Sequence, residues 1–100
     1  MMFPKPVRPS RGTADAKRYL ALVAAQPCVI CGDFPVVVHH CISGRFSQRK
    51  ASDFDTIPLC PEHHDSLHAW RAVWEATHGP DTRYLPLVRD TIQRYLESFV

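Results

Sequence analysis

Two short cysteine and histidine motifs carry the plainest chemistry in this 100-residue chain. Cys28-Val-Ile-Cys31 and Cys60-Pro-Glu-His63 each place two residues between a pair of metal-binding side chains. That spacing lets both side chains of a tight turn reach one tetrahedral ion, and two such turns complete a structural zinc site. The alternative is a set of buried thiols near a surface histidine. We expect a zinc site formed by Cys28, Cys31, Cys60 and His63.

A second group of histidines is left once that zinc site is complete. His64 and His68 are four positions apart, so on a helix they share one face and can hold a metal ion together. His39 ends an apolar segment that antiparallel strand pairing could bring over the start of the same helix. Three neutral imidazoles with open coordination positions favour a catalytic metal ion, whereas His64 and His68 alone could form a solvated helix face. The roles of His63 and His64 could also be exchanged, because adjacent helix residues diverge by about 100°.

His40 follows His39 directly and carries a different expectation. Adjacent strand residues point to opposite faces, so His40 need not bind the ion that His39 binds. A free imidazole beside a metal ion suits a general base, because imidazole titrates close to neutral pH. A hydrogen-bonded core histidine is the alternative. Cys41 lacks a partner at the spacing of the two motifs and is expected to be a small core residue.

The segments that must position these groups predict an α+β fold. Thr13 is a plausible N-cap for an amphipathic helix that ends at Gln26-Pro27. Apolar segments at residues 34–39 and 54–59 predict two short strands that pair antiparallel. Residues 1–12 are rich in proline and basic side chains, and we expect a flexible N-terminal arm followed by a single domain over residues 13–100.

Two further helices are expected in the second half of the chain. One begins at Pro61 and runs to about Thr77, where Gly79-Pro80 stops it. Its buried side is expected to hold Leu67, Trp70, Val73 and Trp74. A last helix over residues 81–99 shows apolar residues at helical spacing and is expected to close the core.

The net charge of +2 does not by itself indicate a nucleic-acid-binding protein, but basic residues gather in places. Arg45, Arg49 and Lys50 lie in the polar segment between the two strands and are candidates for contacts with DNA phosphates. An ordinary solvated surface is the alternative. The chain starts without an apolar leader, and its four cysteines alternate with histidines. We therefore expect a cytoplasmic protein with reduced thiols and no membrane partner.

The spacing of the histidines resembles the signature of the HNH (ββα-metal) nucleases. His39-His40 is followed by fourteen residues, Asp55, eight residues, His64, three residues and His68. The flanking cysteine motifs resemble the zinc-containing subgroup of that superfamily. Val38-His-His-Cys-Ile-Ser-Gly, Ile57-Pro-Leu-Cys-Pro-Glu-His-His and Trp74-Glu-Ala-Thr-His-Gly are further similar to the phage RecA-dependent (Ref-like) nucleases. The resemblance spans about residues 26–98 and implies a small ββα-metal core with a zinc knuckle, flanked by a helix at each end.

The resemblance implies a metal-dependent endodeoxyribonuclease. His40 would be the general base, and His39, His64 and His68 would hold Mg²⁺ or another divalent cation. Asp55 stands where the family commonly has Asn, and it would orient His40 or reach the metal ion. The implied partners are DNA, cleaved with little sequence preference, and a RecA filament in phage recombination within a bacterial host. The competing interpretations are a zinc-binding module without catalysis that docks DNA or protein, and an HNH-like domain that the change at Asp55 has inactivated.

Overall fold

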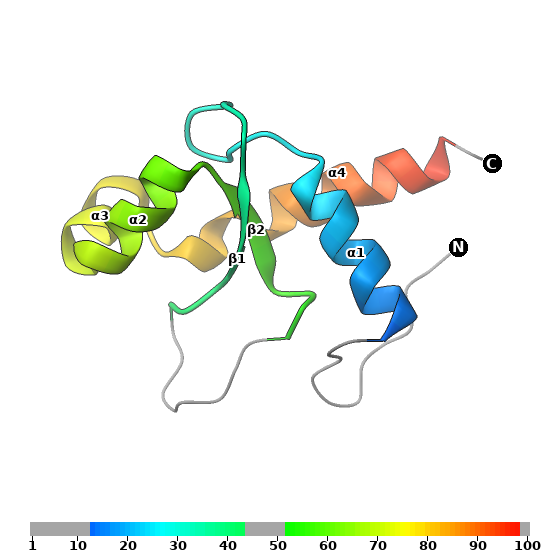
Figure 1. Cartoon of the computed structure of the whole chain (residues 1–100), viewed down its shortest axis with the longest axis horizontal. Helices are drawn as coiled ribbons and strands as arrows, with labels where there is room; N and C mark the ends of the chain where they lie inside the picture. Colours follow the sequence, from blue (N-terminus) through cyan, green and yellow to red (C-terminus); the bar gives the residue numbers. More distant parts are fainter. Residues whose placement is uncertain (1–12, 44–51, 99–100) are drawn as a thin grey trace.

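Two antiparallel strands lie at the centre of the molecule, with helices on either side of them (Figure 1). The computed structural model describes residues 13–43 and 52–98. In chain order its elements are α1 (Ala14–Ala24), β1 (Val37–His40), β2 (Thr56–Leu59), α2 (Pro61–Ala69), α3 (Arg71–His78), the 3₁₀ turn η1 (Asp81–Tyr84) and α4 (Leu85–Glu97). The expected α+β class is confirmed. Among the described residues, no helix is long and apolar enough to cross a membrane.

The two strands pair in the antiparallel arrangement that the sequence predicts. His39 lies opposite Ile57, and His40 lies opposite Thr56. The first strand is shorter than expected and begins at Val37, because Pro35 has no N–H group to donate to a sheet. It also includes His40, so both histidines of the pair belong to regular strand backbone and point to opposite faces.

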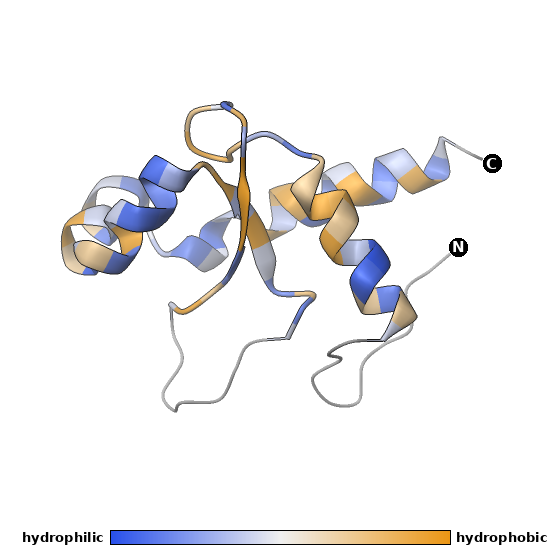
Figure 2. Cartoon of the chain, in the orientation of Figure 1, coloured by the Kyte–Doolittle hydropathy of each residue, from blue (hydrophilic) through white to orange (hydrophobic). Residues whose placement is uncertain are grey.

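The first helix begins where the sequence predicts. The Thr13 side chain accepts a hydrogen bond from the backbone N–H of Ala16, which satisfies one of the free donors of the helix N-terminus. Its buried side chains, Ala16, Tyr19 and Val23, face the sheet and α4. Figure 2 shows the same division, with hydrophobic residues along the strands and along parts of α1 and α4. The largest fully buried side chains include Ile57, Leu59, Leu67, Val23 and Val88.

The prediction of one helix from Pro61 to about Thr77 is wrong. Trp70 has φ −137° and ψ 55°, which ends α2 at Ala69 and begins α3 at Arg71. Polar contacts orient α3 separately, because Arg71 donates to the carbonyl of Ile42, two residues after β1 ends. The change of direction buries Leu67 and Trp74 as expected, but leaves Trp70 68% and Val73 65% exposed.

The last helix also differs from its predicted extent. Gly79 ends α3 with φ 83°, a conformation that glycine adopts without strain. The residues at 81–84 form a 3₁₀ turn, and α4 begins only at Leu85. Pro86 explains this start, because it has no N–H for a bond to the carbonyl of residue 82 and its ring would clash there. Proline is instead accommodated in the first turn of α4, and Leu85, Val88 and Ile92 face the core.

Candidate metal centres

The first candidate centre lies between the turn after α1 and the N-terminus of α2. The backbone N–H of Gly32 donates to the Cys28 carbonyl (2.8 Å) and closes a tight turn around Cys28 and Cys31. Cys60 is the N-cap of α2, and its Sγ lies 3.1 Å from His63 Nδ1 and 3.8 Å from Cys31 Sγ. The ligand atoms of these four residues all lie within 4.8 Å of one another. Cys28, Cys31, Cys60 and His63 are therefore close enough to bind a metal ion such as zinc, as the sequence predicts.

The surroundings shift the pKa values of two thiols of this centre in opposite directions. Burial raises the pKa of the Cys28 thiol, but hydrogen bonds from nearby backbone N–H groups outweigh it, so the pKa lies below its ordinary value. The backbone N–H of Asp33 lowers the pKa of Cys31, but desolvation and the two neighbouring thiols outweigh it and raise that pKa to about 11. The Cys28 thiolate is therefore favoured, and the Cys31 thiolate is disfavoured unless a cation balances its charge. A zinc ion supplies that balance in sites of this composition.

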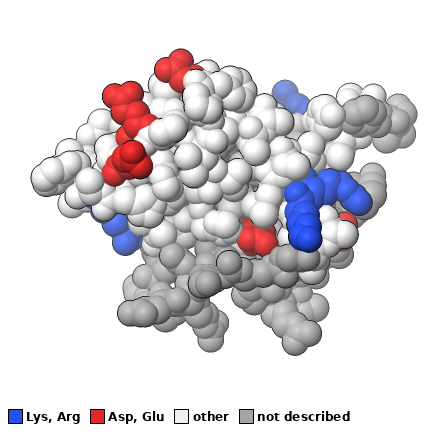
Figure 3. Space-filling model, viewed as in Figure 1, with Lys and Arg blue, Asp and Glu red and all other residues white. Residues whose placement is uncertain are grey.

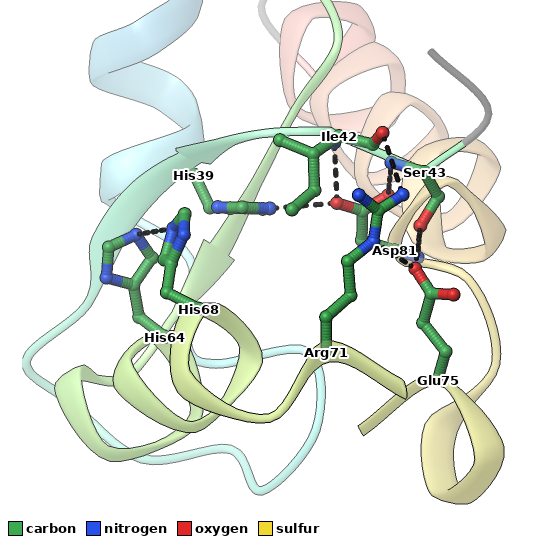
Figure 4. A network of polar contacts seen from close by, with 8 residues as sticks. All are labelled: His39, Ile42, Ser43, His64, His68, Arg71, Glu75 and Asp81. Carbon is green, nitrogen blue, oxygen red and sulfur yellow. Dashed lines mark hydrogen bonds and ion pairs between the residues drawn. The ribbon is translucent and has the colours of Figure 1, made fainter. Parts of the chain in front are cut away.

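The second candidate centre combines β1 with α2. His39 projects from β1 toward His64 and His68, which lie one turn apart on α2 (Figure 4). The His39 ring centroid lies 5.3 Å from that of His64 and 5.4 Å from that of His68, and the Nε2 atoms of His64 and His68 are 3.2 Å apart. The three imidazoles each offer a nitrogen within 4.8 Å of the others. Burial, followed by the neighbouring His68 and His39, lowers the pKa of His64, which favours the neutral form that binds metal ions.

The structure thus separates the two adjacent histidines on α2. His63 faces the cysteine sulfurs, and His64 faces His39 and His68. The sequence alone left these positions interchangeable. Cys41 is buried in the hydrophobic core, as predicted, and lies outside both groups.

A buried carboxylate contacts His39 of the second centre. Asp81 is fully buried, and its Oδ2 lies 2.9 Å from His39 Nε2. Burial alone would raise the pKa of Asp81, but donors from His39 and from the backbone N–H groups of Ile42 and Ser43 lower it to about 2. Asp81 is therefore an ionised acceptor on the side of His39 away from the other two imidazoles (Figure 4).

His40 has a carboxylate partner of its own. Its Nε2 lies 2.7 Å from Asp53 Oδ1, and the His40 side chain is 36% exposed while Asp53 is 7% exposed. Asp55 was expected to orient His40 or to reach the metal ion, and the structure brings it to neither place: Asp53 pairs with His40, and Asp55 does not belong to the histidine group. The side chain of Asp55 instead forms an ion pair with Arg89 of α4, and its backbone carbonyl accepts from the N–H of Cys41. Asp53 lies in the turn before β2, and that turn directs it rather than Asp55 at His40.

Sequence reasoning missed both carboxylates that contact the histidine pair. Asp53 and Asp55 lie in one polar segment, and their spacing does not distinguish which of them reaches His40. Asp81 follows Gly79-Pro80 and was expected only to start a helix. It lies 42 positions after His39, so only the folded chain reveals the contact.

The proposed phosphate-binding residues Arg45, Arg49 and Lys50 lie outside the described residues, as does the arm at residues 1–12. On the face in Figure 3, the charged side chains of the described part are sparse, with acidic groups over α2 and basic groups over α1. The described part of this face therefore does not present a continuous basic surface.

Comparison with known proteins places the chain in a family. It is 34% identical over 73 residues to "Uncharacterized protein YdfU" of Escherichia coli (strain K12), a match that covers 71% of this chain and 21% of that protein. The chain thus spans about a fifth of the length of the curated relative it matches. No solved structure matches the chain. A family model described as "Protein of unknown function (DUF968)" matches residues 3–97, and the chain therefore belongs to that family.

Proposed function

We propose that this protein is a metal-dependent endodeoxyribonuclease with an HNH-type ββα-metal site and a separate structural zinc site. The observation that carries the proposal is the convergence of His39, His64 and His68 from a strand and a helix. The next residue of that strand, the partly exposed His40, pairs with the buried carboxylate of Asp53. A structural zinc site alone would leave these five side chains without a function. Three imidazoles that converge on one point, with a carboxylate-paired histidine next to one of them in the chain, support an active site better than any single motif does.

The two candidate centres suit different metal ions. Three cysteines and one histidine form a closed tetrahedral set of the kind that holds structural zinc. Three imidazoles leave coordination positions open for water or substrate, and His39, His64 and His68 would hold the catalytic divalent cation, Mg²⁺ or another. Such a cation, when bound, polarises a phosphate oxygen and stabilises the charge on the departing 3′ oxygen.

Other residues of the chain would activate the attacking water and bind the DNA backbone. Asp53 Oδ1 lies 2.7 Å from Nε2 of His40. By accepting a hydrogen bond from that nitrogen, Asp53 would orient the ring and leave Nδ1 to take a proton from the attacking water. The exposure of His40 lets water and a phosphodiester approach it. Arg45, Arg49 and Lys50 would hold the DNA backbone without reading sequence.

Cleavage of DNA by the purified protein tests the proposal. Supercoiled and single-stranded DNA are incubated with Mg²⁺ or Mn²⁺, and with a chelator that spares the cysteine-bound zinc. We expect metal-dependent cleavage by the wild-type protein, and a rate about 10²–10⁴-fold lower for His40→Ala. A further arm with a RecA filament on the DNA tests whether the filament stimulates cleavage.

Two matched variants test the assignment of the carboxylates. Asp53→Asn removes the negative partner of His40 and should lower the cleavage rate at least tenfold, whereas Asp55→Asn, two positions away, should leave it within about threefold of wild type. Equal background cleavage by the wild-type and His40→Ala proteins would contradict the nuclease proposal. DNA binding with intact zinc and no cleavage would indicate a zinc-binding docking module instead.

A further inference from the structure

Asp81 is a fully buried carboxylate whose hydrogen bonds all point to the segment that carries His39. Its Oδ2 lies 2.9 Å from His39 Nε2 and accepts from the backbone N–H of Ile42 (2.7 Å). Its Oδ1 accepts from the backbone N–H of Ser43 (3.0 Å). A buried charge is costly unless it is well hydrogen-bonded, and three donors around one carboxylate meet that requirement.

The arrangement determines where His39 carries its proton. An ionised carboxylate only accepts hydrogen bonds, and the two backbone groups that face it are obligatory donors. Nε2 of His39 must therefore be the protonated nitrogen. In the neutral ring Nδ1 then holds the lone pair, on the side where His64 and His68 lie (Figure 4).

A second layer of contacts holds Asp81 in place. The Ser43 hydroxyl accepts from the backbone N–H of Asp81 (3.1 Å) and donates to Glu75 of α3 (2.8 Å). Arg71 donates to the same Glu75 oxygen (2.9 Å) and to the Ile42 carbonyl (3.2 Å). Asp81 is thus held through its backbone as well as through its side chain. The same hydrogen bonds connect η1 and α3 to the segment that follows β1.

We propose that Asp81 is a positioning residue that holds His39 in the Nε2-protonated form, with Nδ1 directed at the site of the divalent cation. The inference rests on the proposed function in one respect, namely that His39, His64 and His68 bind a metal ion. It assigns a role to a residue outside the spacing pattern of the histidines. Carboxylates that support a ligand histidine in this way raise its basicity and typically contribute ten- to a hundredfold in metal affinity.

The protonation of His39 can be measured without any metal in the histidine centre. Long-range ¹H–¹⁵N spectra of the imidazoles are recorded above neutral pH on protein with zinc in the cysteine site only. We expect wild-type His39 as a single form with the proton on Nε2. In Asp81→Asn the amide offers a donor as well as an acceptor, so we expect a mixture of the two forms. Asp90→Asn is the matched control, because Asp90 forms an exposed ion pair with Arg94 on α4.

Metal affinity supplies the second readout, with Ni²⁺ as the probe because imidazole ligands suit it. In calorimetric titrations of the zinc-loaded protein, Asp81→Asn should weaken Ni²⁺ binding about ten- to a hundredfold relative to Asp90→Asn. A wild-type His39 that carries its proton on Nδ1 would overturn the inference, even if the variant failed to fold. Unchanged spectra and affinity in Asp81→Asn would overturn it as well. If His64→Ala left Ni²⁺ binding unaltered, the metal site of the proposed function would fail, while the wild-type spectra would still decide the role of Asp81.

Discussion

At the scale of single residues, two pairs of adjacent histidines are divided between different tasks by backbone geometry. Along β1, successive side chains alternate between faces, so His39 is buried against α2 and Asp81 while His40 reaches Asp53 and solvent. Along α2, neighbouring side chains are rotated by about 100°, so His63 and His64 face different centres. The four histidines of these two adjacent pairs thus lie in three different environments: the cysteine centre, the histidine centre and the contact with Asp53.

A pH dependence of metal binding follows from His64. Its pKa is lowered by burial first and by the neighbouring His68 and His39 next, so the ring stays neutral at a lower pH than a histidine in an unfolded chain. His64 should therefore remain able to bind a metal ion below about pH 6.5, the ordinary value, and should lose that ability as the pH falls further and the ring takes up a proton. Because the unfolded chain takes up this proton first, the same shift destabilises the folded protein as pH falls through that range.

The pH prediction is checked by NMR titration of His64 and by Ni²⁺ titrations at several pH values. His68→Ala should move the pKa of His64 part of the way back up, since burial remains. A pKa of His64 at or above that of a free histidine would contradict the prediction.

At the scale of elements, α2 joins the two centres. Its N-cap Cys60 and its third residue His63 belong to the first, and the following residues His64 and His68, one turn apart, belong to the second. The Cys28–Cys31 turn is attached to the sheet by a bond from the Val29 N–H to the Pro58 carbonyl. An ion held by the cysteine centre therefore anchors the start of α2 to the turn after α1.

Loss of a zinc ion from the cysteine centre is expected to destabilise the fold greatly, if zinc occupies that centre as proposed. The free energy of zinc binding to sites of this kind is about 10–16 kcal/mol, as large as the whole stability of a small domain, about 5–15 kcal/mol. We expect a strong chelator, or Cys60→Ala, to abolish cooperative thermal unfolding measured by circular dichroism. Cys41→Ala is the matched control, because Cys41 is equally a buried cysteine but lies outside the centre. It should retain one zinc per chain, and similar losses in both variants would argue against a structural ion.

At the scale of the whole molecule, one hydrophobic core supports both centres. Leu67 is fully buried on α2, between the positions of His64 and His68, and belongs to the same core cluster as Ile57 opposite His39. Packing of this side chain holds the helix that carries His64 and His68 against the strand that carries His39. Positioning of the candidate site and stability of the domain therefore depend on shared contacts.

Truncation of that side chain tests the connection. Leu67→Ala should lower the free energy of unfolding by about 2–5 kcal/mol in urea denaturation of the zinc-loaded protein. Leu87→Ala removes the same atoms from a side chain that is 56% exposed, and should change stability by less than about 0.5 kcal/mol. Comparable losses in the two variants would show that the core does not depend on Leu67 in this way.

The sequence by itself determined the features that depend on spacing within one element. The two cysteine motifs, the pair of histidines one helical turn apart, the N-cap at Thr13 and the antiparallel strands follow from local periodicity, which fixes how nearby side chains point. Tertiary structure alone decided which carboxylate meets each histidine, because Asp53 reaches His40 across a turn and Asp81 reaches His39 across 42 positions. It also decided the break at Trp70, since contacts of Arg71 with the segment that follows β1 outweigh a helical pattern that continues unbroken in the sequence.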